Sequence, residues 1–253
     1  MPDSGDRPQV LIEEFMPVKE LGIESKRERS ASSALPPMSY LHVWWARRPL
    51  TVSRAAILAS MLPADTDAKW FLKVLGIMGD PVSTYARLQR AKRKGERVES
   101  YSYDRAFQYT PPLSVVEDVR ERIASLWEQE DMVVLDPMAG GGSIPFEAMR
   151  YGFDTYANEL NPVAAVILEA TLRYPAQFGP ELAKDIRRWA DELHRRVKPQ
   201  LAEFYPKQKG EEVFAYVWAR TVKCPNCGLI VPLSPNWWLE KSGDDGTAVR
   251  LVP

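Results

Sequence analysis

The chain is poor in cysteine and histidine, and this scarcity limits the metal and redox chemistry that it carries. Its 253 residues include two cysteines, Cys224 and Cys227, and two histidines, His42 and His194. Cysteines so close in sequence do not form the disulfide framework of a small secreted protein. Structural zinc needs four ligands, so the cysteine pair supplies half of such a site.

Long apolar runs and an excess of charge of one sign are also missing. No stretch approaches the roughly 20 apolar residues of a membrane span, and the N-terminus lacks the basic and apolar segments of a signal peptide. We therefore expect a cytoplasmic protein with no membrane partner. The net charge is −1, so any DNA contact has to come from local basic patches.

The remaining composition is that of a globular protein. Hydrophobic residues make up 45% of the chain and charged residues 26%, which is enough for one large or two smaller domains. Apolar periodicity predicts helices over residues 49–62 and 180–204. We predict a helical N-terminal region over 1–100, a partial α/β domain over 101–205, and the start of a zinc-ribbon insertion, marked by the Cys pair, over 206–253.

Residues 133–162 carry an alternation of strand and helix. Val133–Leu135 is an apolar strand of the type buried in parallel sheets. A helix over Ile144–Tyr151 ends at Gly152, Asp154–Ala157 forms the next strand, and Pro162 opens another helix. This order predicts a right-handed βαβ unit of a doubly wound sheet.

A glycine turn connects the first of these strands to its helix. Gly140, Gly141 and Gly142 permit close approach of the backbone to a ligand, and the start of the helix offers free N–H groups. Glu159 follows the second strand, 19 residues after Gly140, where it can accept hydrogen bonds from ribose hydroxyls. We predict a nucleotide-like cofactor here; a purely structural turn is the alternative.

The details of the turn argue against two common phosphate-binding sites. No Gly-Lys-Ser/Thr follows the glycines, as a phosphate-binding loop requires. Pro145 stands where the dinucleotide fingerprint has its third glycine. An oxidoreductase that uses a dinucleotide is therefore only a distant alternative.

The turn Asp136-Pro137-x-x-Gly-Gly-Gly-Ser resembles motif I of the amino-group DNA methyltransferases, which binds S-adenosylmethionine. The resemblance implies a partial Rossmann-like doubly wound sheet of a class I methyltransferase, with Glu159 on the ribose. Phe107–Pro112 resembles the segment that contacts the methionine end of the cofactor, although a helix-entry turn explains it equally well. The implied cofactor-binding residues are Tyr109, Thr110, Pro111, Asp136, Pro137, Ala139, Gly140, Gly141, Gly142, Ser143, Glu159 and Asn161.

A wider resemblance covers roughly residues 10–253. Leu41–Leu50, with the sequence Leu-His-Val-Trp-Trp-Ala-Arg-Arg-Pro-Leu, is similar to a signature of adenine-specific DNA methylases that contain a zinc ribbon. In that family the signature lies in an N-terminal domain of unknown function. The glycine turn, Asn158–Ala164 and Cys224–Gly228 match the same family in the same order. The resemblance implies S-adenosylmethionine as cofactor and double-stranded DNA as partner.

The catalytic motif of such a methylase is missing. That motif, Asn/Asp-Pro-Pro-Tyr/Phe, clamps the amino group of a flipped base, and neither Asn-Pro-Pro nor Asp-Pro-Pro occurs in the chain. Catalytic residues therefore stay unknown. We expect the N-terminal portion of a longer or split enzyme, inactive alone, whose catalytic half is a downstream polypeptide. A catalytically inactive cofactor- or DNA-binding subunit is the alternative.

The Cys-x-x-Cys pair has the spacing of half a zinc ribbon. Asn226 and Gly228 tolerate the positive φ angles that such turns need. We predict that Cys224 and Cys227 bind Zn²⁺ as an incomplete site. A redox pair, or a pair without function, is the alternative.

Two clusters are rich in basic residues, and the first of them also contains tryptophans. Trp45, Arg47 and Arg48 are predicted to contact DNA, by stacking on bases and by holding phosphates. For Trp44 and Trp45 themselves, burial in the core is the favoured interpretation. For Arg47 and Arg48, phosphate contact is favoured, and capping a helix or pairing with acids is the alternative. The basic run Arg87–Arg97 is predicted to be a solvated face, with DNA contact as its alternative.

Overall fold

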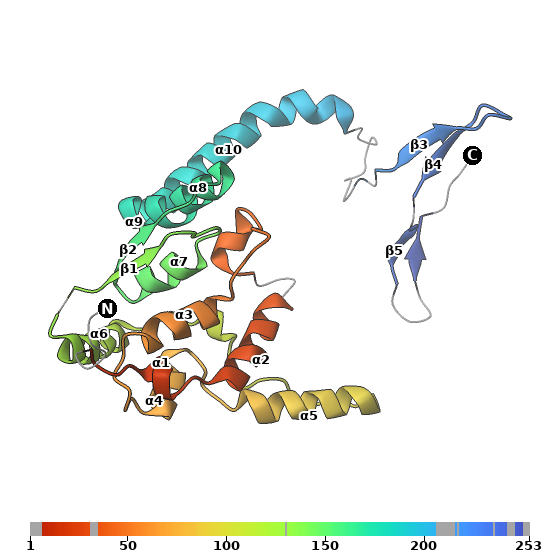
Figure 1. The fold of residues 1–253 in the computed structure, drawn as a ribbon. Coiled ribbons are helices and arrows are strands. Elements are labelled where there is room, and N and C mark those ends of the chain that lie inside the picture. The colour runs from red at the N-terminus through yellow and green to blue at the C-terminus, as the bar shows by residue number, and fades with distance from the viewer. Residues whose placement is uncertain are drawn as a thin grey trace. The chain divides into compact units, whose positions relative to one another are not determined.

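The computed structural model describes residues 7–30, 35–129, 131–205, 216, 218–234, 236–241 and 246–249. The chain forms two compact units, Met1–Lys184 and Asp185–Pro253 (Figure 1), and each is described by itself. In the part of the chain that the structure describes, no helix is both long and apolar enough to cross a membrane.

The first unit begins with a helical region. Its α-helices are α1 (Leu11–Glu14), α2 (Val18–Arg29), α3 (Leu50–Ala59), α4 (Ala68–Val74), α5 (Pro81–Lys94) and α6 (Leu113–Trp127), with short 3-10 turns at Pro37–Tyr40 and Ala106–Gln108. Local signals explain several ends. Asp67 and Asp80 accept backbone N–H groups at the starts of α4 and α5. Gly95 ends α5 at a φ of 71°. The helix expected over 49–62 is confirmed by α3.

A βαβ unit follows. Strands β1 (Val133–Asp136) and β2 (Asp154–Ala157) pair in parallel, with Leu135 opposite Tyr156, and α7 (Ser143–Arg150) connects them. After β2 come α8 (Pro162–Leu168), a π-helical turn (Glu169–Arg173) and α9 (Tyr174–Phe178). The predicted order of strand, helix, strand and helix is confirmed. Whether the sheet belongs to a complete doubly wound fold stays a prediction, because its described part contains these two strands.

One expectation about β1 is wrong. The strand was expected to be buried on both faces, but Val133 is 55% exposed and Leu135 66% exposed, as is Tyr156 on β2 at 65%. Side chains alternate along a strand, and the intervening Val134 packs against the core. Burial on both faces needs covering elements on each side of a sheet. The described residues cover only the Val134 face.

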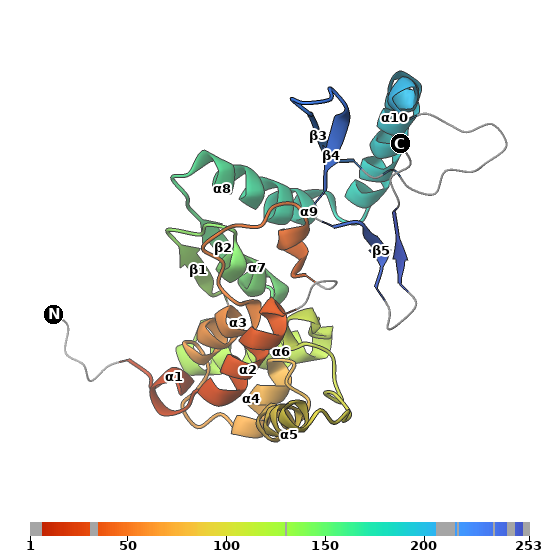
Figure 2. The same cartoon turned by 90° about the vertical axis from the view of Figure 1, so that its right-hand side faces the viewer.

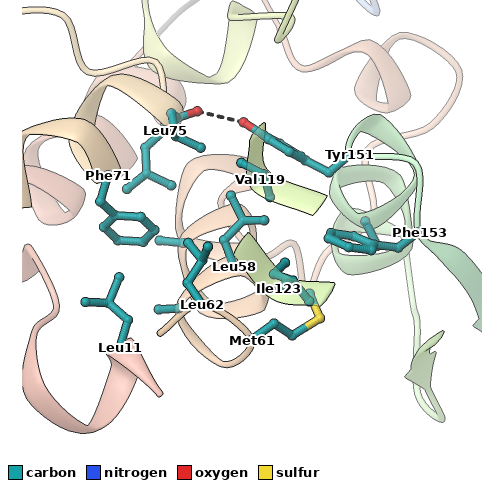
Figure 3. Packing of buried hydrophobic residues seen from close by; sticks show 14 of the residues in the cluster. Leu11, Leu58, Met61, Leu62, Phe71, Leu75, Val119, Ile123, Tyr151 and Phe153 are labelled. Carbon is teal, nitrogen blue, oxygen red and sulfur yellow. Dashed lines mark hydrogen bonds between the residues drawn. The ribbon is translucent and has the colours of Figure 1, made fainter. Parts of the chain in front are cut away.

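One hydrophobic core joins the helical region to the βαβ unit. Tyr151 and Phe153, between α7 and β2, lie in the same cluster as Leu58 of α3 and Ile123 of α6 (Figure 3). The Tyr151 hydroxyl donates a hydrogen bond of 2.6 Å to the carbonyl of Val74. Each fully buried apolar side chain contributes about 1.5–3 kcal/mol. The core therefore continues across residue 100, where the sequence predicted a boundary between parts.

The second unit holds most of helix α10 (Glu181–Leu201) and two antiparallel strand pairs. The pairs are β3 (Arg220–Lys223) with β4 (Ile230–Leu233), and β5 (Trp238–Glu240) with β6 (Thr247–Ala248). Pro199 lies in the last turn of α10, as expected of a residue that ends or kinks a helix. The alternating pattern of residues 214–222 predicts a strand. Residues 214, 215 and 217 lie outside the described residues, and Arg220–Val222 belongs to β3.

Candidate functional site

The glycine turn between β1 and α7 is held by local hydrogen bonds. Asp136 is buried, and its Oδ1 accepts the N–H of Met138 at 3.1 Å. Gly140 and Gly142 have φ angles of 52° and 83°, in the left-handed region that favours glycine. The N–H of Gly142 donates to the carbonyl of Ala139 at 2.8 Å. The chain thereby reverses directly into α7, which begins at Ser143.

The loop after β2 lies against this turn. Asn158 donates its backbone N–H to the Asp136 carbonyl at 2.9 Å, and its own carbonyl accepts the N–H of Ala139 at 3.0 Å. Its side-chain amide donates to the Pro137 carbonyl at 3.1 Å. These bonds extend the pairing of the two strands beyond their ends. They bring the residue after Asn158 beside the glycines.

Glu159 is that residue, and its carboxylate bridges the two loops. Oε2 accepts the N–H of Gly140 at 2.7 Å, while Oε1 accepts the N–H groups of Leu160 at 2.9 Å and Asn161 at 3.1 Å. The backbone N–H groups of Asn161 and Gly140 lower the pKa of Glu159, because they favour its charged form. The predicted turn and the predicted acid are therefore in direct contact. Asn161 also caps α8, with its Oδ1 accepting the N–H of Val163.

A cavity of about 410 Å³ opens beside Glu159. It lies between the end of β2 and α8, and several of its wall residues are apolar. The lining includes Ala157, Asn158, Ala165, Val166, Leu168 and Tyr174. A carboxylate next to an apolar recess suits a ligand with hydroxyl groups on one part and a flat apolar ring on another.

Trp44 packs on the glycines of the turn, and sequence reasoning did not include it in the cofactor site. A Cβ on Gly140 would lie 2.8 Å from the indole Nε1 of Trp44, and a Cβ on Gly141 would lie 2.9 Å from the Cβ of Trp44. The absence of side chains at both glycines therefore admits this ring. Trp44 is half-buried, but Trp45 is 86% exposed, so the favoured interpretation that both tryptophans are core is wrong for Trp45.

Tyr109, Thr110 and Pro111 lie beside another part of α7. The Tyr109 carbonyl accepts hydrogen bonds from Arg54 and Arg150, and the Thr110 hydroxyl lies 3.1 Å from Nη2 of Arg150. Arg150 is the last residue of α7, at the end opposite the glycine turn. Pro111 is buried. The contacts of this segment are thus with the C-terminal end of α7.

A buried ion pair between Arg54 and Glu147 connects α3 to α7. This pair was not predicted from the sequence. Nε of Arg54 lies 2.7 Å from Oε2 of Glu147, with both side chains fully buried. The same guanidinium donates to the carbonyls of Leu75 at 2.8 Å and Ala106 at 3.1 Å. Burial lowers the pKa of Arg54, but the Glu147 carboxylate more than offsets this and the net pKa shift is upward. The sequence did contain an indication of this pair, because Arg54 is a charged residue on the otherwise apolar face of α3.

A second buried carboxylate contacts the start of α3. Glu28 of α2 accepts the N–H of Leu50 with both oxygens, at 3.2 and 3.0 Å, and so caps α3. Burial raises the pKa of Glu28 to about 7. Arg47 and Arg48 are exposed beside this cap, and Arg48 donates to the Ala46 carbonyl at 3.2 Å.

Residues 15–74 match the family described as "Protein of unknown function (DUF1156)". We call this range the DUF1156 region; it contains α2, α3 and α4, and also Trp44 and Arg54. Neither the curated proteins nor the solved structures contain a match to the chain.

Helix α5 (labelled in Figure 2) follows the DUF1156 region in the sequence and is rich in basic residues. It contains no acidic residue. Its basic side chains are all exposed: Arg87, Arg90, Lys92, Arg93 and Lys94. Arg87, Arg90 and Lys94 line one groove of about 330 Å³, as their spacing of three and four residues on a helix requires.

In the second unit, Cys224 and Cys227 lie at the tip of the β3–β4 hairpin. The N–H of Gly228 donates to the Cys224 carbonyl at 2.9 Å, and Gly228 has a φ of 73°. The backbone N–H groups of Cys227 and Asn226 lower the pKa of the Cys224 thiol. Within the described ranges, no third His, Cys, Asp or Glu joins the pair. The two thiolates suit Zn²⁺ chemically but leave a tetrahedral site half filled.

Proposed function

We propose that this chain is the cofactor-binding portion of a DNA adenine-N6 methyltransferase that uses S-adenosylmethionine. The observation that supports this most strongly is the 2.7 Å hydrogen bond between the N–H of Gly140 and Glu159. It joins a glycine turn and an acid at the carboxyl ends of adjacent parallel strands, which is where open α/β sheets bind their ligands.

Each part of the proposed cofactor has a matching group in this site. S-adenosylmethionine supplies an activated methyl group when it is bound. The Glu159 carboxylate would hold the ribose hydroxyls, and the recess lined by Ala157 and Val166 would take the adenine ring. The free N–H groups at the start of α7 attract the carboxylate of the methionine part.

DNA is the proposed substrate. Trp45, Arg47 and Arg48 are exposed in the segment that contacts the glycine turn through Trp44. An exposed indole can stack on a base and the guanidinium groups can hold phosphates. This group of side chains supports a contact with DNA close to the site of methyl transfer.

The reacting half of the enzyme is proposed to be a partner polypeptide. The amide-Pro-Pro-aromatic clamp does not occur in the chain, and without it the base amine is not positioned. The exposed apolar side chains Val133, Leu135 and Tyr156 on one face of the sheet support the docking of further elements there. A catalytically inactive cofactor- or DNA-binding subunit is the second candidate, favoured by the same missing clamp.

Calorimetry with S-adenosylmethionine and with NAD tests the cofactor. We expect the chain to bind the first and not the second. Glu159→Ala should weaken S-adenosylmethionine binding about ten- to a hundredfold, because the ribose hydroxyls would lose a charged hydrogen-bond acceptor. Glu159→Gln should lose less, since its amide oxygen still accepts from Gly140.

A thermal melt of each variant provides the control for folding. Unchanged affinity in a folded Glu159→Ala chain would contradict the ribose role. Preference for NAD over S-adenosylmethionine would contradict the proposed cofactor.

A further inference from the structure

The DUF1156 region contributes Trp44 to the glycine turn, although Trp44 lies 96 positions before Gly140 in the sequence. In Figure 2 the orange segment that precedes α3 runs past β2 and α7. The indole of Trp44 lies along both Gly140 and Gly141, with Nε1 nearest the Cβ position of the first and its own Cβ nearest that of the second. The turn and the tryptophan therefore form one packed group.

We propose that Trp44 is a cofactor-contact residue: its ring forms one wall of the S-adenosylmethionine site. This inference rests on the proposed function and names a residue for that site from a region whose role is unassigned. A ligand that approaches the backbone of Gly140 and Gly141 closely also reaches the indole, because the ring already lies within contact distance of both glycines.

The burial of Trp44 supports a contact role. The ring is half-buried, whereas the apolar side chains that pack α3 against the core, Leu50, Ala55 and Leu58, are almost fully buried. One part of the indole therefore packs on the turn while another part stays accessible. Side chains that only fill space in a core are enclosed on all sides, as Leu50, Ala55 and Leu58 are.

The chemistry of the cofactor also matches an indole. S-adenosylmethionine carries a positively charged sulfonium and a purine ring. The face of tryptophan attracts cations more strongly than that of the other aromatic residues, and it stacks on purines. Either contact in a partly desolvated site corresponds to roughly a tenfold change in affinity.

Substitutions at Gly140 or Gly141 affect Trp44 as well as the turn. A side chain on Gly140 or Gly141 would displace Trp44 before it met any ligand. Loss of binding in a Gly141→Val chain would therefore report on the tryptophan and the turn together. Substitution of Trp44 itself separates the two.

The experiment measures S-adenosylmethionine binding by calorimetry for the wild-type chain, Trp44→Phe and Trp44→Ala. Trp189→Ala provides the control, since Trp189 is an exposed tryptophan on α10. We expect Trp44→Ala to weaken binding about tenfold or more and Trp44→Phe to weaken it less. Trp189→Ala should bind as the wild type does.

A second readout covers the case in which Trp44→Ala disturbs folding. The change in tryptophan emission on addition of S-adenosylmethionine should be much smaller in Trp44→Phe than in the wild type, and unchanged in Trp189→Phe. Unaltered or tighter binding by a folded Trp44→Ala chain overturns this inference alone, and tighter binding would identify the ring as a plug. Absence of binding by the wild type overturns the inference together with the proposed function.

Discussion

Buried charged side chains connect the helices of the DUF1156 region to one another and to the βαβ unit. Glu28 of α2 caps α3, and Arg54 of α3 pairs with Glu147 of α7. Each group is costly to bury and is accommodated because hydrogen bonds satisfy it. The guanidinium of Arg54 reaches backbone carbonyls as well as Glu147. These side chains therefore link α2 to α3 and α3 to α7, beside the apolar core that the same helices share.

Glu28 should make the stability of the chain depend on pH. Burial raises its pKa from 4.5 to about 7, so the folded state binds this proton more tightly than the unfolded state does. The contribution is fully present below pH 4.5 and is lost as the pH rises towards 7 and beyond. The free energy of unfolding should fall by up to about 3 kcal/mol across this window, and Glu28→Gln should remove that dependence.

Urea denaturation between pH 4.5 and 8 measures the effect. Glu117→Gln is a matched control, because Glu117 is exposed on α6. Other groups also titrate in this range, so the informative quantity is the difference between the two variants. Identical pH profiles for Glu28→Gln and the wild type would contradict a buried, protonated Glu28.

Helix α5 is strongly positively charged, in contrast to the nearly neutral chain as a whole. The chain has a net charge of −1, whereas α5 contains no acidic residue. Glu96, just after the helix, lies 3.9 Å from Lys94 and also lines the groove, so it offsets part of this positive charge. A solvated face was the favoured interpretation of this run. The groove shared by Arg87, Arg90 and Lys94 now supports the alternative, contact with the phosphate backbone of DNA.

Neutralising that groove should weaken duplex binding and its dependence on salt. If Arg87, Arg90 and Lys94 each contact a phosphate, replacing all three by Gln should reduce the slope of log affinity against log salt by about 3. Fluorescence anisotropy of a labelled duplex between 50 and 200 mM salt, an experimental range that brackets physiological ionic strength, measures this.

The control for α5 is a variant with the same change in charge elsewhere. Lys19, Lys69 and Lys73 are exposed on α2 and α4, and their replacement by Gln removes three charges outside the groove. Equal losses of affinity in the two triple variants would show that α5 acts only through net charge.

At the scale of the whole molecule, the chain by itself should transfer no methyl group. The clamp for the base amine does not occur in its sequence, and two thiolates do not complete a zinc site. Co-expression with a polypeptide that carries the clamp motif and a second Cys pair should restore methylation and zinc content. A tritium-transfer assay on unmethylated DNA decides this, and robust incorporation by the chain alone would refute the division into halves.

Substitution on the exposed face of the sheet, which includes Val133, Leu135 and Tyr156, tests where the partner polypeptide docks. Val133→Lys places a charge on that face and should weaken assembly with the partner while S-adenosylmethionine binding by the chain is kept. Val18→Lys is the matched control, since Val18 is 72% exposed on α2. Equal assembly by the two variants would exclude this face as the docking surface.

The sequence by itself determined the local elements of this protein. The apolar run of β1, Gly152 after α7 and Pro162 at the start of α8 act over a few residues, so their patterns predict structure without knowledge of distant contacts. The proximity of Glu159 to Gly140 was also predictable, because a βαβ unit brings the carboxyl ends of parallel strands to one edge.

Only the tertiary structure decided which distant segments meet. Trp44 on the glycines, Arg54 against Glu147 and the uncovered face at Leu135 each depend on contacts between segments far apart in the sequence. A periodic pattern shows that a side chain faces an interior but not which partner fills it. The wall of the candidate site and the burial of its strands were therefore determined by packing between elements, which no local pattern records.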